Sequence, residues 1–246
     1  NDQWRWILGT NVERSPMKSS EINISINRDP ITGQYLNYKT GNVRRDYEVT
    51  IENQALYSQL EYSPQPTMRW VAGLRYDRIG YDYDNHLLPS NTTGAPSEHR
   101  RYSHVSPKLG LSWQLAPLLN VYSNISQGFV PPEVSAQYGG SQTSPNLREA
   151  TFNNVDMGAR WVSPERSWLS DVSLYRLTGK DEVVSYSIAP GLSESRNAGK
   201  TLHQGLEFSI QYQPVSKLWD AKFNGAYAKH TFKEYRTSNV LNYADK

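Results

Sequence analysis

Apolar and polar residues alternate one by one over long parts of the chain. A period of two places successive side chains on opposite faces of a β-strand, so each such stretch predicts a strand with one apolar and one polar face. No stretch shows a comparable apolar period of 3.6 residues, and the pattern therefore predicts an all-β, antiparallel fold. The clearest alternating stretches are residues 68–76, 108–115, 154–161, 202–212 and 219–227.

The connections between the predicted strands alternate between two kinds. Proline marks the short turns, because it fixes φ and cannot donate to a strand ladder. Longer polar segments separate these turns. Short turns on one end and long loops on the other are typical of an outer-membrane β-barrel, with the long loops extracellular. The short turns lie near 63–66, 116–117, 163–166 and 214–216, and the long connections near Ser15–Tyr47, Asn85–Arg101, Gly128–Ala150 and, shorter, Ala189–Glu194.

Strand length and aromatic residues favour the same interpretation. The segments 67–84 and 167–186 exceed the ~9–11 residues with which a tilted strand crosses a bilayer. Aromatic residues cluster near strand ends, where a membrane barrel carries its interfacial girdles. The residues assigned to these girdles are Trp4, Trp6, Tyr62, Trp70, Tyr81, Tyr83, Trp113, Trp161, Trp168, Tyr212 and Trp219.

The pattern gives about nine strands, from Trp4 to near His230. An odd number with two open edges does not close a single-chain bacterial barrel, and unpaired backbone groups are costly inside a membrane. We therefore expect residues 1–246 to be one partial domain of an antiparallel transmembrane β-barrel, with the remaining strands elsewhere in the parent protein.

Composition removes several other classes. A mean hydropathy of −0.70 with 7 Trp and 17 Tyr fits a wall in which only every second residue faces lipid, and the aromatic content argues against disorder. A net charge of +2 excludes a strongly basic nucleic-acid-binding protein. The chain has no Cys, which excludes disulfides and thiolate metal sites.

Four segments resemble the TonB-dependent receptors, in the order expected for that family. They are Val71–Asp77 (VAGLRYD), Ser106–Trp113 (SPKLGLSW), Val121–Pro132 (VYSNISQGFVPP) and Arg196–Phe208 (RNAGKTLHQGLEF). The resemblance implies a barrel of roughly 22 strands, of which this chain supplies about nine, closed by an N-terminal plug. It also implies TonB-driven uptake of a ferric siderophore, with the TonB complex engaged through the plug region, which is absent here.

Candidate ligand-binding residues combine cationic and aromatic side chains at the predicted loop ends. Many ferric siderophores are anionic, so arginine beside an aromatic ring suits their capture through charge and cation–π contact. The simpler interpretation, which we favour from the sequence, pairs the same arginines with lipopolysaccharide phosphates or nearby carboxylates. Lys108, Arg160 and Glu207 would face the plug from the lumen. The candidates are Arg44, Arg45, Arg100, Arg101, Tyr35, Tyr38, Phe129 and Tyr138.

Catalytic and metal-binding motifs are not found in the sequence. The segment 82–85 lacks the glycine of a calcium loop, and we assign no cofactor or metal to His86, His99 and His104, although these flank one predicted loop. Several alternatives stay open: uptake of cobalamin, haem or a sugar, an outer-membrane adhesin or enzyme barrel, and a secreted β-sandwich.

Overall fold

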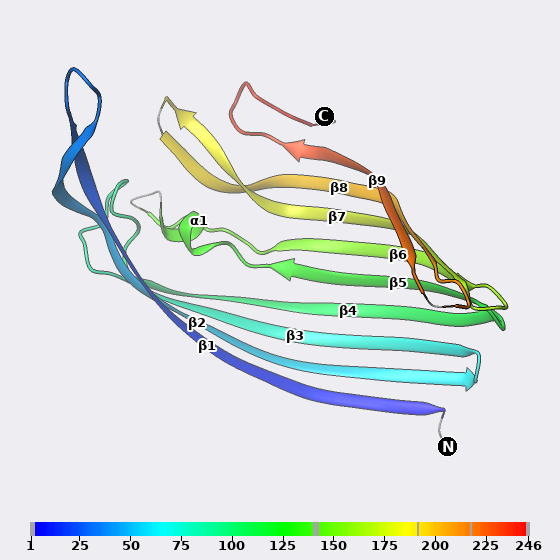
Figure 1. Ribbon diagram of the computed structural model, residues 1–246. Helices are drawn as coiled ribbons and strands as arrows, with labels where there is room; N and C mark the ends of the chain where they lie inside the picture. The colour runs from blue at the N-terminus through cyan, green and yellow to red at the C-terminus, as the bar shows by residue number, and fades with distance from the viewer. Residues whose placement is uncertain (1–2, 140–142, 191, 217, 245–246) are drawn as a thin grey trace.

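The computed structural model describes residues 3–139, 143–190, 192–216 and 218–244. One antiparallel sheet contains nine strands in the order of the chain, and it curves into a trough (Figure 1). In the described residues β1 pairs with β2 alone and β9 with β8 alone. The strands are β1 (Trp4–Arg28), β2 (Tyr35–Gln65), β3 (Met68–Asn85), β4 (Glu98–Ala116), β5 (Leu119–Val130), β6 (Ala150–Val162), β7 (Trp168–Ala189), β8 (Leu192–Tyr212) and β9 (Ala221–Tyr235), and one short helix, α1 (Val134–Tyr138), follows β5.

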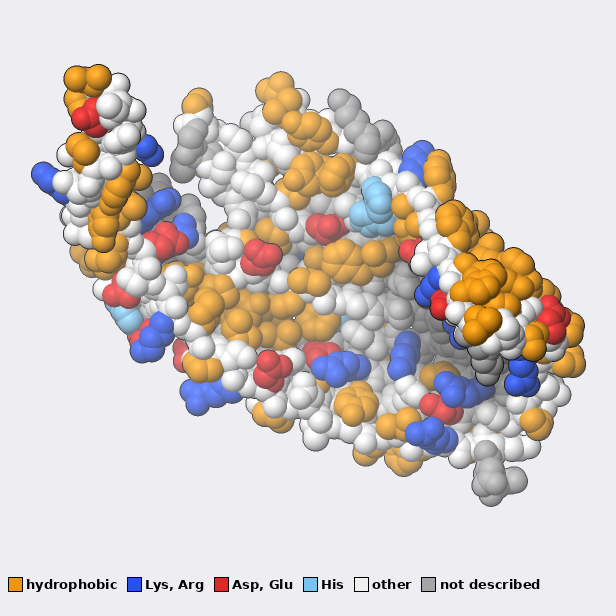
Figure 2. Space-filling model, viewed as in Figure 1, with side chains coloured by type: hydrophobic (Ala, Val, Ile, Leu, Met, Phe, Trp, Pro, Cys, Tyr) orange, Lys and Arg blue, Asp and Glu red, His pale blue; other side chains and the backbone are white. Residues whose placement is uncertain are grey.

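The two faces of the sheet differ in chemistry. On the outer face the alternating apolar side chains are uncovered, as Leu74 and Leu109 show with 54% and 47% exposure. The inner face is hollowed, and it carries charged and polar side chains together with patches of hydrophobic ones (Figure 2). An uncovered apolar face on a sheet with a polar inner face is what a membrane barrel wall requires. Among the described residues, no helix has the length and apolar character needed to cross a membrane.

The outward-facing residues of β3 indicate where the membrane-spanning part of the strand ends. Its outer row begins with Trp70 and continues through Leu74 and Tyr76, and from Arg78 to Asp82 the same row is polar. The eight-residue interval from Trp70 to Arg78 spans ~26 Å along the strand at ~3.3 Å per residue. At a strand tilt of ~40° this is ~20 Å of depth, close to the ~25 Å apolar band of a transmembrane barrel. The residues of β3 after Arg78 therefore lie above the membrane, on the side of the long loops.

The longest connection differs from its prediction. Residues 15–47 do not form a long polar loop: β1 runs to Arg28, β2 starts at Tyr35, and the turn closes with a 2.9 Å hydrogen bond from the Gly33 amide to the Asp29 carbonyl. The strand continues because the period of two continues, with isoleucines at every second position from Ile22 to Ile26. Above Tyr47 these two strands pair with each other only, so they form a free-standing hairpin, coloured blue in Figure 1.

The predicted aromatic girdle forms at the end with the short turns. Trp4 stacks on Tyr62 with ring centroids 4.1 Å apart, and Trp168 lies 4.5 Å from Tyr212. The assignment of Tyr81 and Tyr83 to a girdle is wrong, since both side chains are inward and at most 4% exposed. They lie above the membrane, on the β3 face that also carries Asp77, where another part of the chain covers them.

Candidate functional site

The connection between β5 and β6 folds back over the inner face of the sheet. We call residues 131–139 and 143–149 the inner loop. Its helix α1 follows Pro131–Pro132 and ends at Gly139, and it brings Tyr138 onto strands β2–β4. Tyr138 is 1% exposed and stacks flat on Tyr83, with ring centroids 4.1 Å apart and planes inclined by 4°.

Four rings form the centre of this contact, and we call Tyr81, Tyr83, Tyr102 and Tyr138 the tyrosine cluster. Tyr81 meets Tyr102 edge to face at 5.5 Å. The Tyr81 hydroxyl donates a 3.0 Å hydrogen bond to the Pro132 carbonyl, and the Tyr102 hydroxyl donates to Gln137 Oε1 at 3.1 Å. Each of these bonds joins β3 or β4 to the inner loop. The aliphatic side chains around the cluster belong to Val49, Ile79 and Ala95.

Two arginines tie the inner loop to the sheet from opposite sides. Arg100 forms a 2.7 Å ion pair with Glu98 and donates to the Pro145 carbonyl at 3.1 Å. Arg45 donates to the Gly139 carbonyl at 2.6 Å, next to the end of α1, and pairs with Glu21 at 3.2 Å. Charge-assisted bonds of this kind are roughly twice as strong as neutral ones. Both side chains are about one-fifth exposed, so they retain limited contact with solvent.

The β3–β4 connection adds a third contact to the inner loop. The Ala95 amide donates to the Tyr138 carbonyl at 2.9 Å, and the Asn85 side chain donates to the Ala95 carbonyl at 2.8 Å. Gly94 has φ +101°, and a Cβ there would lie 2.8 Å from the Tyr138 carbonyl oxygen. Glycine is therefore needed both for the backbone conformation and for the close approach. The two loops form one packed unit at the extracellular end.

Because its tyrosines are buried, the packing of the tyrosine cluster depends on pH. Loss of solvation raises the pKa of Tyr81, Tyr83 and Tyr102 to about 12, and burial raises the pKa of Tyr138 as well. A group whose pKa is higher in the folded state stabilises that state below its ordinary pKa, here 10, and loses this contribution as the pH rises to its folded value. We expect the inner loop to stay packed at pH 9 and to detach between pH 10 and 12. Tyrosinate absorbance and protease cleavage within 131–149 should rise together, and cleavage that is constant over this range would contradict the prediction.

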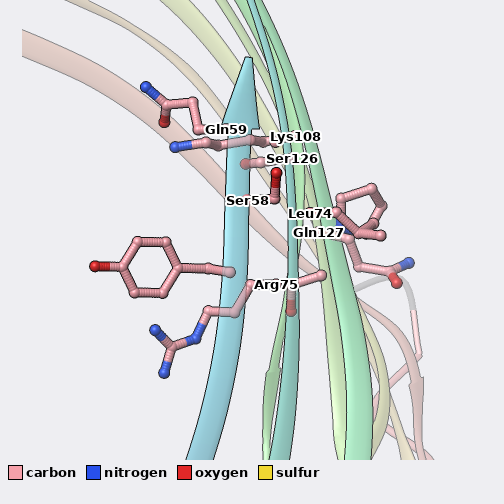
Figure 3. Close-up of a pocket in the computed structure, with 11 residues that line it drawn as sticks. Ser58, Gln59, Leu74, Arg75, Lys108, Ser126 and Gln127 are labelled. Atoms are coloured by element: carbon pink, nitrogen blue, oxygen red, sulfur yellow. The ribbon is translucent and has the colours of Figure 1, made fainter. Parts of the chain in front are cut away.

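Below the inner loop, the lumen wall has a shallow depression of about 290 Å³. Gln59, Arg75 and Lys108 project to one side of the sheet there, and Leu74 and Gln127 project to the other (Figure 3). The Lys108 side chain lies across Gly73, where a Cβ would be 2.5 Å from Lys108 Cε.

The charges in this depression do not cancel. Arg75 is neutralised by Asp77, which it contacts through Nε and Nη2 at 2.7–3.0 Å. Lys108 has no hydrogen-bond or ion-pair partner among the residues the structure describes. The depression therefore carries a net positive charge and suits an anionic group.

The eight predicted binding residues fall into three places. Arg45, Arg100 and Tyr138 meet at the inner loop, and Phe129 stacks on His104 beside it at 4.7 Å. Their role as ligand contacts stays a prediction. The other four are exposed. Tyr35, Tyr38 and Arg44 lie on the free-standing hairpin, with Arg44 at a β-bulge between Val43 and Arg45. Arg101 donates from Nε to His99 Nε2 at 2.9 Å.

Sequence reasoning did not assign Tyr81, Tyr83, Tyr102 or Gln137 to the site. The available signal was the alternation of the two strand faces. Tyr81 and Tyr83 continue the row of odd-numbered, inward-facing residues of β3 that begins with Arg69. The three histidines near the β3–β4 connection do not converge: His86 lies 3.4 Å from Asp46, and His104 lies 3.7 Å from Glu149. Across the described ranges, no three His, Cys, Asp or Glu side chains gather in a metal-binding arrangement.

The sheet and its inner loop define a class, the wall of a large outer-membrane β-barrel with an inward-folded extracellular loop. The family model described as TonB dependent receptor-like, beta-barrel matches residues 3–246, and the chain belongs to this family. This confirms the predicted partial barrel and places the protein in the outer membrane of a Gram-negative bacterium.

Solved structures share the fold at low sequence identity. The siderophore receptor PiuA from Acinetobacter baumannii is 12% identical with a TM-score of 0.69, over 95% of this chain and 36% of that one. The ferric yersiniabactin uptake receptor FyuA from Yersinia pestis is 16% identical with a TM-score of 0.68, over 94% and 33%. The copper transporter OprC is also 16% identical with a TM-score of 0.68, over 94% and 35%. The chain thus spans about a third of the length of these structures.

Proposed function

We propose that this chain is part of a receptor that imports a ferric siderophore across the outer membrane in a TonB-dependent manner. The observation that carries the proposal is the positively charged depression around Lys108, which lies in the lumen wall below the inner loop. An anionic ferric chelate that passes the loops meets a cation there without a competing carboxylate partner among the described residues.

The family and the cargo named for similar structures support this choice of substrate. A siderophore receptor, a ferric yersiniabactin receptor and the Ferric-Catecholate import receptor Fiu from K12 E. coli share the fold. The copper transporter OprC shows that the same barrel also serves another metal, so the cargo must be tested directly.

The proposed partners follow from the same assignment. The TonB complex would act through the plug, and lipid and lipopolysaccharide would contact the outer face. Exposed Arg44 and Arg101, with Tyr35 and Tyr38, would meet ligand or lipopolysaccharide phosphate first. Arg45, Arg100, Phe129 and Tyr138 would act by positioning the inner loop around a ligand. We propose residues 1–246 as one barrel portion with no catalytic role.

Uptake by whole cells tests the cargo. Cells that lack the full-length gene should lose uptake of one radiolabelled ferric siderophore, and the gene in trans should restore it only while the proton gradient is intact. Labelled cobalamin, haem and a sugar are measured in parallel. Loss of one of these with unchanged iron uptake would keep the receptor class and refute the siderophore.

The variant Lys108→Gln tests the lumen cation. Removing one partly desolvated charge–charge contact of ~1 kcal/mol should weaken the apparent affinity for the ferric siderophore about fivefold. The matched control is Arg78→Gln, which removes an exposed cation from the outer face of the neighbouring strand and should leave the affinity unchanged. An unchanged affinity in Lys108→Gln, with a lowered melting temperature, would instead assign Lys108 to contacts with the plug.

A further inference from the structure

Two histidines lie directly opposite each other on the last two strands. His203 on β8 pairs in register with His230 on β9, and their Nδ1 atoms are 2.6 Å apart. The rings are inclined by 57° with centroids 4.9 Å apart, so the nitrogens converge and the rings do not stack. His203 is partly exposed and His230 is exposed. The pair thus presents two imidazole nitrogens at one accessible point.

The register places this pair on the inner face, at the upper edge of the membrane span. His203 shares its face with Gly205 and Glu207, which point into the lumen. On the outer face, Gln204 and Lys229 interrupt the apolar row directly above Leu206 and Tyr227. The histidines are therefore open to the mouth of the barrel and not to lipid.

Neither histidine is paired with a carboxylate of the described residues. In the part of the chain that the structure describes, neither His203 nor His230 has an ion-pair partner, and no third His, Cys, Asp or Glu completes a cluster. Among the described residues, the only polar contact of each ring is the other ring. In that contact one Nδ1–H donates to the lone pair of the other Nδ1.

We propose that His203 and His230 form a two-histidine site for a divalent transition-metal ion, with Cu²⁺ bound most tightly. Imidazole is a good ligand for Cu²⁺, which also stands highest among the divalent first-row ions in affinity for nitrogen sites. On binding, the bridging hydrogen leaves Nδ1 and, by exchange with water, a hydrogen is taken up at Nε2 of the same ring. Both Nδ1 lone pairs then face the metal, and the neutral pair releases no net proton.

The separation of the nitrogens favours a square-planar ion. With metal–nitrogen bonds of ~2.0 Å, two neighbouring ligands lie ~2.8 Å apart at 90° and ~3.3 Å apart at the tetrahedral angle. The observed 2.6 Å is closer to the first value. Both imidazole rings must rotate so that each Nδ1 lone pair turns by about 45° from the line between the nitrogens toward the ion. The remaining positions are left to water or to donor atoms of a bound chelate, so the ion is held reversibly.

Titration of the full-length receptor in detergent with Cu²⁺ alone tests the site. The variants are His203→Asn, His230→Asn and the double variant, and His99→Asn removes an exposed histidine outside the pair. Calorimetry should show that each single substitution weakens one Cu²⁺ site at least about tenfold, because the second ligand acts at high effective concentration. The double variant should lose the same single site and no more, and His99→Asn should keep it.

Electron paramagnetic resonance of the wild-type complex provides a measurement that needs no variant. Two coupled imidazole nitrogens on one Cu²⁺ are expected. Coupling to one imidazole, separate losses that add in the double variant, or an equal loss in His99→Asn would each overturn the proposal. Heat-modifiable gel migration confirms that every variant retains the barrel.

Discussion

The variant Tyr138→Ala is expected to detach the inner loop from the sheet. Tyr138 is 1% exposed and stacks on Tyr83. Truncating a large buried aromatic side chain costs ~3–5 kcal/mol, since the cavity that it leaves is only partly refilled. Because the loop is a surface element, this cost should appear as a lower free energy of local opening. Amide hydrogen exchange of residues 133–139 in the full-length receptor measures it directly.

Tyr138→Phe provides the matched control for this truncation. The Tyr138 hydroxyl is buried and has no hydrogen-bond partner among the described residues. Removing an unsatisfied buried hydroxyl costs at most ~1 kcal/mol and can be neutral, because no bond is lost. If phenylalanine opened the loop as much as alanine does, the ring stacking would not be what holds it.

The variant Arg100→Ala should have the second largest effect on the same loop. It removes the ion pair to Glu98 and the bond to the Pro145 carbonyl, and it leaves the Glu98 carboxylate half-buried without its cation. Hydrogen bonds of charged groups are each worth ~1.5–3 kcal/mol, so we expect local opening to become easier by ~2–3 kcal/mol after partial rehydration. Protease cleavage near 143–146 should accelerate accordingly.

Two further substitutions separate charge from geometry at this position. Arg100→Lys keeps the charge but loses the planar donor fork, and should recover part of the protection. Arg101→Ala removes the exposed neighbouring arginine and should change the opening free energy by less than ~0.5 kcal/mol. Equal cleavage rates in the alanine variants at 100 and 101 would show that the loop does not depend on the Arg100 contacts.

The sequence was sufficient for the strands and the short turns because both depend on local chemistry. Alternation sets the two faces of a strand, and proline marks the turns. The same reasoning failed for the β1–β2 hairpin, since serine and asparagine between isoleucines suggested a loop although the period of two persisted through Ile26.

The inner loop could not be predicted, because its contacts join distant parts of the chain. Tyr81 and Pro132 are 51 residues apart, and Arg100 and Pro145 are 45 apart. Nothing local indicates that the chain after Pro132 turns toward the lumen and not toward solvent. The parity of Tyr81 and Tyr83 did indicate an inward row, and only the fold showed what covers it.

The free-standing hairpin and the barrel wall are expected to differ in their tolerance to sequence change. Beyond Tyr47, its two strands have no third strand beside them, and isolated two-stranded ribbons are marginally stable. Arg45 still holds the base of the hairpin to the Gly139 carbonyl of the inner loop, so only the part of the hairpin beyond Arg45 is expected to open without disturbing the barrel wall. Mutations, insertions and deletions near Asp29–Gln34 are therefore expected to leave the wall intact, so the outermost surface can diversify while the membrane-embedded wall stays unchanged.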